Sequence, residues 1–79
     1  MDLGALESQL VALAAKAIDV DPSIIKLNET FDQFGADSLD FVSFIMAIED
    51  FFDVEIPDTD AEKLTTIQLA AEYLQNKLS

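Results

Sequence analysis

The 79-residue sequence contains neither cysteine nor histidine. Without cysteine it can form no disulfide and no thiolate metal site, and without histidine it lacks the commonest general base and nitrogen ligand. A serine nucleophile needs such a base within reach, so we expect the protein not to be an enzyme. The N-terminus has no basic segment followed by an apolar one, and no apolar run approaches the roughly 20 residues of a membrane span. We therefore expect no signal peptide, no membrane insertion and a cytoplasmic location.

Basic residues are scarce, because four lysines and no arginine oppose 16 acidic residues and leave a formal net charge of −12. Such a chain is repelled by the phosphates of nucleic acids and by anionic membrane surfaces. The acidity could serve solubility alone, or it could steer the protein toward basic partner surfaces. Which of the two applies depends on where the acidic residues lie.

Carboxylates alone could hold a metal ion, and the spacing Asp19-x-Asp21 is similar to the opening of a calcium loop. The sixth position of such a loop requires glycine and the twelfth requires a bidentate glutamate. The sequence has Ile24 and Thr30 at these positions, so we expect no dedicated metal site.

Apolar residues recur at helical spacing in several segments, and no strand pattern persists. The expected helices cover residues 3–18, 38–52, 58–63 and 65–77. Asp2 and Asp58 are expected N-caps, and Thr65 with Gln68 has capping-box spacing. Pro22 ends the first helix before it. We predict one all-α domain over residues 1–79, a small bundle of three main helices plus one short helix.

The connection between the first two helices is long, from about residue 19 to residue 37. It contains too many large apolar residues for a free loop: Ile24, Ile25, Leu27, Phe31 and Phe34. We expect these side chains to pin the connection to the bundle, so that the loop is ordered.

The second expected helix has two apolar faces. One is a core stripe that comprises Phe41, Ile45, Ile48 and Phe52, with Phe44 at its edge. The other carries Leu39, Val42 and Met46, which lie among Glu49, Asp50 and Asp53 and close to Ser43. Burial all round would explain the apolar residues, but carboxylates are rarely buried unpaired. We therefore favour a docking face, with an apolar centre for contact and an acidic rim for approach.

Ser38 lies where a polar loop becomes this helix. Asp37 is an equally good or better N-cap, which would leave Ser38 at the first helical position with a free, outward hydroxyl. The exposed N–H groups and the macrodipole at a helix N-terminus favour an attached anion, so a phosphoester would be stabilised there. Gly35 allows the preceding turn to bend. A purely structural serine remains the alternative on these grounds alone.

The segment Gly35-Ala36-Asp37-Ser38-Leu39 resembles the 4′-phosphopantetheine attachment motif of acyl carrier proteins. The similarity continues through Asp40, Val42, Met46-Ala47-Ile48-Glu49-Asp50, Phe52, Glu55-Ile56-Pro57-Asp58, Ala61-Glu62-Lys63 and Thr65-Thr66-Ile67-Gln68. It is close from Phe31 to Tyr73, whereas the first helix agrees only in pattern and length.

This resemblance implies a discrete, monomeric type II carrier. A phosphopantetheinyl transferase, using coenzyme A and a divalent metal, would attach the arm to Ser38 between Asp37 and Leu39. The arm's thiol would carry acyl groups as thioesters to synthases, reductases, transferases or ligases of fatty-acid or related acyl-chain biosynthesis, all with basic docking surfaces. The implied docking residues are Asp37, Leu39, Asp40, Val42, Met46, Glu49, Asp50 and Asp53. The implied cargo-lining residues are Phe44, Ile48, Phe52, Ile56, Ala61, Leu64, Ile67 and Ala70.

Three departures from the family pattern favour a more specialised role. Ser43 stands where many members have glutamate, Phe41 is bulkier than usual, and the segment 31–35 is one residue shorter than in typical fatty-acid carriers. The alternative is therefore a carrier for a polyketide, secondary or envelope-lipid pathway. A further alternative is an acidic protein-interaction module in which Ser38 is never modified.

Overall fold

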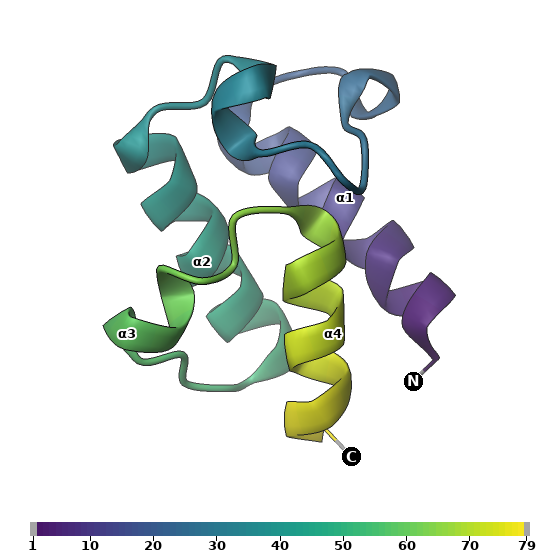
Figure 1. The fold of residues 1–79 in the computed structure, drawn as a ribbon, viewed down its shortest axis with the longest axis vertical. Helices are drawn as coiled ribbons and strands as arrows, with labels where there is room; N and C mark the ends of the chain where they lie inside the picture. Colours follow the sequence, from purple (N-terminus) through teal and green to yellow (C-terminus); the bar gives the residue numbers. More distant parts are fainter. Residues whose placement is uncertain (1, 79) are drawn as a thin grey trace.

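The computed structural model describes residues 2–78. Four α-helices and two short 3₁₀ helices follow one another along the chain: α1 (Leu3–Ile18), η1 (Pro22–Ile24), η2 (Phe31–Phe34), α2 (Ser38–Phe52), α3 (Asp58–Ala61) and α4 (Ile67–Leu78). Helix α1 packs against both α2 and α4, and the long connection with its two 3₁₀ turns covers one end of the bundle (Figure 1). The all-α prediction of three main helices and one short helix is confirmed.

The core lies where the three long helices meet. Six large side chains have no or almost no exposed surface: Leu6 and Leu10 of α1, Phe44 and Ile48 of α2, and Ile67 and Leu74 of α4. Burying each such side chain contributes about 1.5–3 kcal/mol. No charged or polar residue among the described residues is buried. The net charge of −12 is therefore carried entirely outside this core.

The ends of α1 and α2 follow from local chemistry. The Asp2 carboxylate accepts a hydrogen bond from the Ala5 N–H at 2.7 Å, which confirms the expected N-cap of α1. Asp19 and Asp53 end α1 and α2 in the left-handed conformation, with φ of 57° and 55°. An αL residue at this position lets the next N–H groups reach back to the last carbonyls of a helix. The bounds of both helices agree with the sequence-based expectation.

Helix α3 starts differently from the expectation. Asp58 was expected as its N-cap, but Asp58 is the first helical residue and Pro57 occupies the cap position without a side-chain hydrogen bond. The Pro57 carbonyl accepts instead from the N–H groups of Asp60 and Ala61, both at 2.9 Å. Proline favours this arrangement because its fixed φ prepares the chain for a helical turn. The helix also ends early, at Ala61 instead of residue 63.

The start of α4 also differs. The Thr65–Gln68 capping box is absent, and α4 begins at Ile67. The cap is Thr66, whose hydroxyl accepts from the Leu69 N–H at 3.1 Å. The Gln68 N–H donates to the Leu27 carbonyl at 3.0 Å, and Thr30 forms an isolated bridge with Thr66. These contacts with the long connection hold residues 65 and 66 outside the helix.

The long connection is ordered, as expected, but only three of its five apolar anchors are buried. Ile25, Phe31 and Phe34 are buried, whereas Ile24 and Leu27 are exposed. Ile24 ends the single turn of η1, so its side chain and that of Ile25 cannot both face the bundle. Asp21 caps this turn by accepting from the Ser23 N–H at 2.8 Å. The backbone N–H and then the hydroxyl of Ser23 lower the pKa of Asp21.

The core stripe of α2 is rotated relative to the expectation. Phe44, Ile45 and Ile48 are buried, whereas Phe41 and Phe52 are only half-buried. A helical wheel gives the apolar side of a helix, but the neighbouring helix fixes which residues on that side are covered. Here α2 packs chiefly on α1, and Phe44 and Ile48 are its large side chains with no exposed surface. Within residues 2–78, no helix has the length and apolarity needed to cross a bilayer.

Candidate functional site

Ser38 is the first residue of α2, and the residue before it closes the helix end. The Asp37 carboxylate accepts from the Asp40 N–H at 2.9 Å, and the Asp40 carboxylate accepts from the Asp37 N–H at 3.2 Å. This reciprocal pair is a capping box, with Asp40 in the place usually taken by glutamate or glutamine. Of the two candidate caps that the sequence offers, Asp37 and not Ser38 caps α2.

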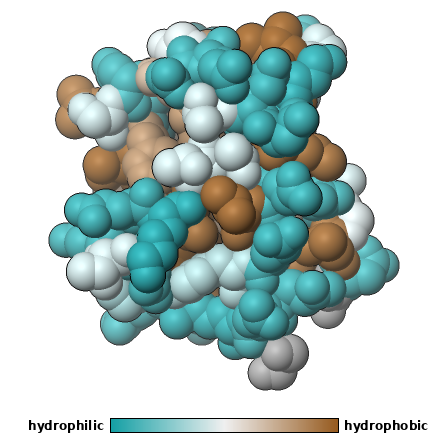
Figure 2. Space-filling model, in the orientation of Figure 1, coloured by the Kyte–Doolittle hydropathy of each residue, from teal (hydrophilic) through white to brown (hydrophobic). Residues whose placement is uncertain are grey.

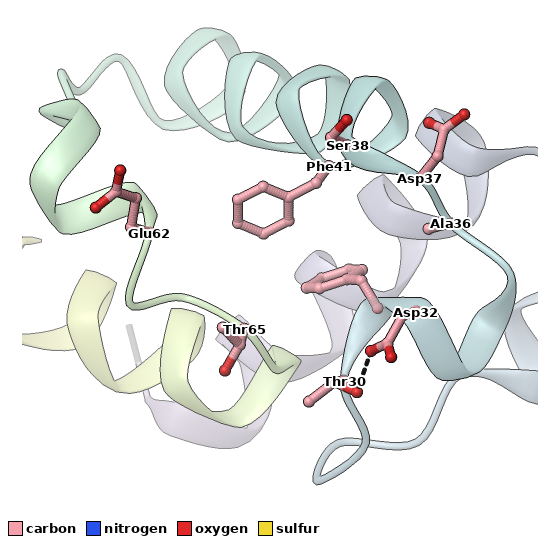
Figure 3. Close-up of a pocket in the computed structure, with 9 residues that line it drawn as sticks. Thr30, Asp32, Ala36, Asp37, Ser38, Phe41, Glu62 and Thr65 are labelled. Carbon is pink, nitrogen blue, oxygen red and sulfur yellow. Dashed lines mark hydrogen bonds between the residues drawn. The ribbon is translucent and has the colours of Figure 1, made fainter.

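The Ser38 hydroxyl is therefore uncommitted. Ser38 is exposed, and within the part of the chain that the structure describes its side chain makes no hydrogen bond. Figure 3 shows its oxygen pointing away from the hollow into which the Phe41 ring projects. Gly35, at φ 83°, supplies the left-handed turn that leads the chain from η2 to this position.

An anionic group on this hydroxyl would find a favourable environment. The first N–H groups of an α-helix have no intrahelical acceptor, and here the N–H groups of Ser38 and Leu39 have none elsewhere in residues 2–78. Together with the positive end of the α2 macrodipole, these donors suit a phosphodiester. The residues present thus fit a phosphate-linked group.

The expected docking face of α2 is exposed. Leu39, Val42 and Met46 are 76%, 51% and 58% exposed. Asp37, Asp50 and Asp53 are also exposed, and Asp40 and Glu49 lie at intermediate depth. Figure 2 shows hydrophobic atoms at the upper left, over the first turns of α2, beside hydrophilic atoms. We refer to these residues as the α2 face: Asp37, Leu39, Asp40, Val42, Met46, Glu49, Asp50 and Asp53.

Three acidic residues of the α2 face also have structural partners. Asp37 and Asp40 form the capping box, and the Glu49 carboxylate accepts from the Ile56 N–H at 2.9 Å. The bond between Glu49 and Ile56 ties the loop before α3 back to α2. The sequence carries no signal for it, because the two residues are seven positions apart and outside any local capping motif. Glu49 thus stabilises the fold whatever its role in docking.

Phe51 is a further exposed apolar residue that the sequence analysis left unassigned. It contacts Phe52, with ring centroids 4.9 Å apart, and lines a groove of about 450 Å³ between α1 and α2. The acidic neighbours Asp50 and Asp53 were the signal that could have placed it at the surface. The groove lies apart from Ser38.

Two smaller hollows lie closer to Ser38. The first, of about 310 Å³, is drawn in Figure 3 and is called here the Ser38 hollow. It is lined by Thr30, Phe31, Asp32, Ala36, Asp37, Ser38, Phe41, Glu62 and Thr65. The second, of about 190 Å³, is called the α2–α3 cleft. It is lined by Phe41, Val42, Ile45, Met46, Glu49, Ile56, Asp58 and Ala61.

The residues predicted to line the cargo site are mostly packed as core. Phe44, Ile48, Ile67 and Ala70 have no exposed surface, and Leu64 is also buried. Phe52 is half-buried. Of the predicted set, only Ile56 and Ala61 line the α2–α3 cleft, and none lines the Ser38 hollow. Their role as a cargo site stays a prediction, and it would require the helices to part.

Other polar groups hold the fold together. The Tyr73 hydroxyl donates to the Asp60 carboxylate at 2.7 Å and so joins α4 to α3. Burial and then this hydrogen bond raise the pKa of Tyr73 to about 12. Among the described residues, no group of three acidic side chains is placed to hold a metal ion.

Comparison with known proteins identifies the class that this fold and site define. Residues 8–74 match the family described as a phosphopantetheine attachment site. An acyl carrier protein of Bdellovibrio bacteriovorus is 46% identical over 74 residues, which cover 92% of this chain and 95% of the relative. The chain therefore belongs to the acyl carrier proteins, a family of carriers and not of catalysts, whose covalent cofactor is 4′-phosphopantetheine.

A solved structure agrees with this assignment. The crystal structure of a free-standing peptidyl carrier protein from an uncharacterized Acinetobacter baumannii secondary metabolic pathway superposes with a TM-score of 0.86. The two sequences are 29% identical, and the alignment covers 99% of this chain and 98% of the other. The small helical bundle described above is thus the carrier-protein fold.

Proposed function

We propose that Ser38 is the attachment residue for the phosphopantetheine arm, and that the protein delivers acyl intermediates to enzymes that dock on its α2 face. The observation that carries this proposal is the exposed, unbonded hydroxyl on the first residue of α2. When attached, the arm supplies a thiol that holds acyl groups as thioesters. The protein itself contributes the attachment point and the surface that partners recognise.

The residues around Ser38 have separate tasks in this proposal. Asp37 and Asp40 cap the helix with each other, which keeps the Ser38 hydroxyl free for the transferase. The unpaired N–H groups of Ser38 and Leu39 would hold the phosphodiester and lower the cost of its charge. Gly35 holds the preceding turn clear of the site.

The α2 face serves recognition. Leu39, Val42 and Met46 offer an apolar centre that a partner can cover, and the surrounding carboxylates attract basic surfaces. Complementary charge of this kind chiefly speeds encounter and selects partners. The proposed partners are a phosphopantetheinyl transferase with coenzyme A, and acyl synthases, reductases, transferases or ligases in the cytoplasm.

Two pathways are supported by different observations. The 46% identity to an acyl carrier protein over most of the chain favours fatty-acid or related acyl-chain biosynthesis. A specialised secondary pathway is the second candidate. The similarity to a peptidyl carrier from a secondary metabolic pathway supports it, as do the exposed Ser43 of α2 and the bulky Phe41.

The experiment is in vitro loading of the purified chain with coenzyme A, Mg²⁺ and a broad-specificity phosphopantetheinyl transferase. Intact-mass analysis is expected to detect one added arm on the wild type and on Ser43→Ala, a control that removes the exposed serine just over one turn further along α2. Ser38→Ala is expected to remain unmodified. Arm-free wild type, or a modified Ser38→Ala protein, would contradict the proposal, and the former result would favour an unmodified interaction module.

A further inference from the structure

The Ser38 hollow and the α2–α3 cleft have one residue in common. Of all the residues that line them, only Phe41 lines both. Figure 3 shows the Phe41 ring projecting from α2 into the hollow, toward the segment that carries Glu62 and Thr65. The ring therefore stands where a path from the hollow to the cleft would run.

Phe41 is held in this position by aromatic contacts. Its ring centroid lies 5.4 Å from that of Phe31 of η2, with the rings inclined at 64°. Phe31 in turn contacts Phe44, with ring centroids 4.9 Å apart. The edge-to-face pair of Phe31 and Phe41 stabilises the position of the Phe41 ring beyond the area that the pair buries.

The two hollows differ in chemistry. The Ser38 hollow combines an apolar wall, from Phe31, Ala36 and Phe41, with a polar rim that includes Thr65 and Glu62. Such a mixed surface suits the amide-bearing arm and the first carbons of its cargo. The α2–α3 cleft is bounded largely by apolar side chains and would suit additional CH₂ groups. An alkyl chain that extends beyond the hollow therefore needs the cleft, and Phe41 separates the two.

We propose that Phe41 sets an upper limit on cargo length, so that this carrier shelters short acyl groups and leaves longer alkyl chains in solvent. The inference rests on the proposed attachment of the arm to Ser38. It follows from the position of one side chain between two hollows and makes Phe41 a specificity-determining residue. Removing the ring would join the hollow to the cleft and open a continuous groove along α2.

The test loads wild type and Phe41→Ala with butyryl, hexanoyl, octanoyl or decanoyl arms from the corresponding acyl-coenzyme A, and confirms loading by intact mass. Hydroxylamine then cleaves each thioester to a hydroxamic acid and the free thiol, and the rate reports how far the thioester is exposed. Burying one CH₂ group favours a seated chain by roughly fourfold. In wild type we expect equal rates from hexanoyl to decanoyl. In Phe41→Ala we expect the rate to fall at least roughly fourfold over the same series.

A second readout is the melting temperature of the loaded proteins, because a chain seated in the fold stabilises it. The melting temperature is expected to rise with chain length in Phe41→Ala and to stay level in wild type. If the alanine variant does not fold, Phe41→Leu replaces it. We then expect a smaller rise of the melting temperature with chain length. Phe51→Ala is the matched control, since Phe51 lines neither hollow, and it is expected to behave as wild type.

The outcomes separate the two proposals. Full loading with the same length dependence in wild type and both Phe41 variants would overturn the role of Phe41 alone. Progressive protection of longer chains in wild type would also overturn it. Failure of the arm to attach to wild type would overturn the proposed function, and this inference with it.

Discussion

Helices α2 and α4 bury similar surfaces but expose very different ones. Each places one apolar side in the shared core, with Phe44 and Ile48 on α2 and Ile67 and Leu74 on α4 fully buried. On its other side α2 exposes Leu39, Val42, Met46 and Phe51, whereas α4 exposes Leu69 and Leu78. Burial in the core thus accounts for most apolar side chains of α4, but for only about half of those of α2.

The two helices also differ in their charged residues. From Asp37 to Asp53 the segment of α2 has five acidic residues and no lysine, whereas α4 contains one glutamate and one lysine. Apolar side chains that stay exposed in the free protein contribute no hydrophobic free energy to folding. The apolar centre within the acidic rim of α2 therefore does not stabilise the fold. Stability therefore does not account for the exposed side of α2, which supports the proposed docking role.

The largest effects are expected on the buried sides, where the two helices should behave alike. Ile48→Ala and Leu74→Ala each remove a fully buried side chain and should lower the free energy of unfolding by about 2–5 kcal/mol. Denaturant unfolding of each variant measures this loss. A loss below about 1 kcal/mol at either position would show that the two helices do not share one core.

The exposed sides should respond unequally to the same change. Met46→Glu on α2 and Leu69→Glu on α4 each add one negative charge at a residue that is 58% or 42% exposed. We expect Met46→Glu to lower kcat/KM for arm attachment by the transferase about tenfold, the usual size of a central interface loss. Leu69→Glu should have little effect.

Both variants should keep the helicity and the melting temperature of the wild type, because neither residue is buried. An equal loss of kcat/KM in the two variants would show that net charge alone controls the encounter. Unchanged kinetics in Met46→Glu would remove Met46 from the docking surface.

The smallest effect concerns the hydrogen bond that joins Tyr73 of α4 to Asp60 of α3. Tyr73→Phe removes the hydrogen bond to Asp60 and should lower the free energy of unfolding by about 1 kcal/mol at neutral pH. The pKa of Tyr73 is raised to about 12 in the fold, so the neutral phenol is the form that the fold stabilises. This contribution is present below pH 10 and is lost as the pH rises from 10 to about 12.

The difference in unfolding free energy between wild type and Tyr73→Phe should therefore shrink above pH 10, measured by denaturant unfolding across that range. A difference that is constant with pH would contradict the raised pKa. A variant as stable as wild type at neutral pH would show that the Tyr73–Asp60 bond is not a net contributor.

Local chemistry made much of this structure predictable from the sequence. The bounds of α1 and α2, the cap at Asp37 and the exposure of Leu39, Val42 and Met46 all depend on residues within a few positions of one another. Helical periodicity and capping propensity act over the same range, so a sequence contains this information directly.

What could not be predicted depends on contacts between distant segments. The start of α4 is set by the hydrogen bond from Gln68 to Leu27 and by the bridge between Thr66 and Thr30, both far away in the sequence. The hydrogen bond between Glu49 and Ile56 and the half-exposed position of Phe41 likewise depend on where other segments lie. A helical wheel places Phe41 on the apolar side, but only the assembled fold puts its ring between two hollows.

The most direct test of the account is the site of modification in the protein isolated from its own cells. Cleavage after lysine releases the peptide 27–63, which contains both Ser38 and Ser43, and fragmentation of this peptide locates the arm. We expect a phosphopantetheine arm on Ser38 and an unmodified Ser43. An arm on Ser43, or a peptide that carries no arm at all, would contradict it.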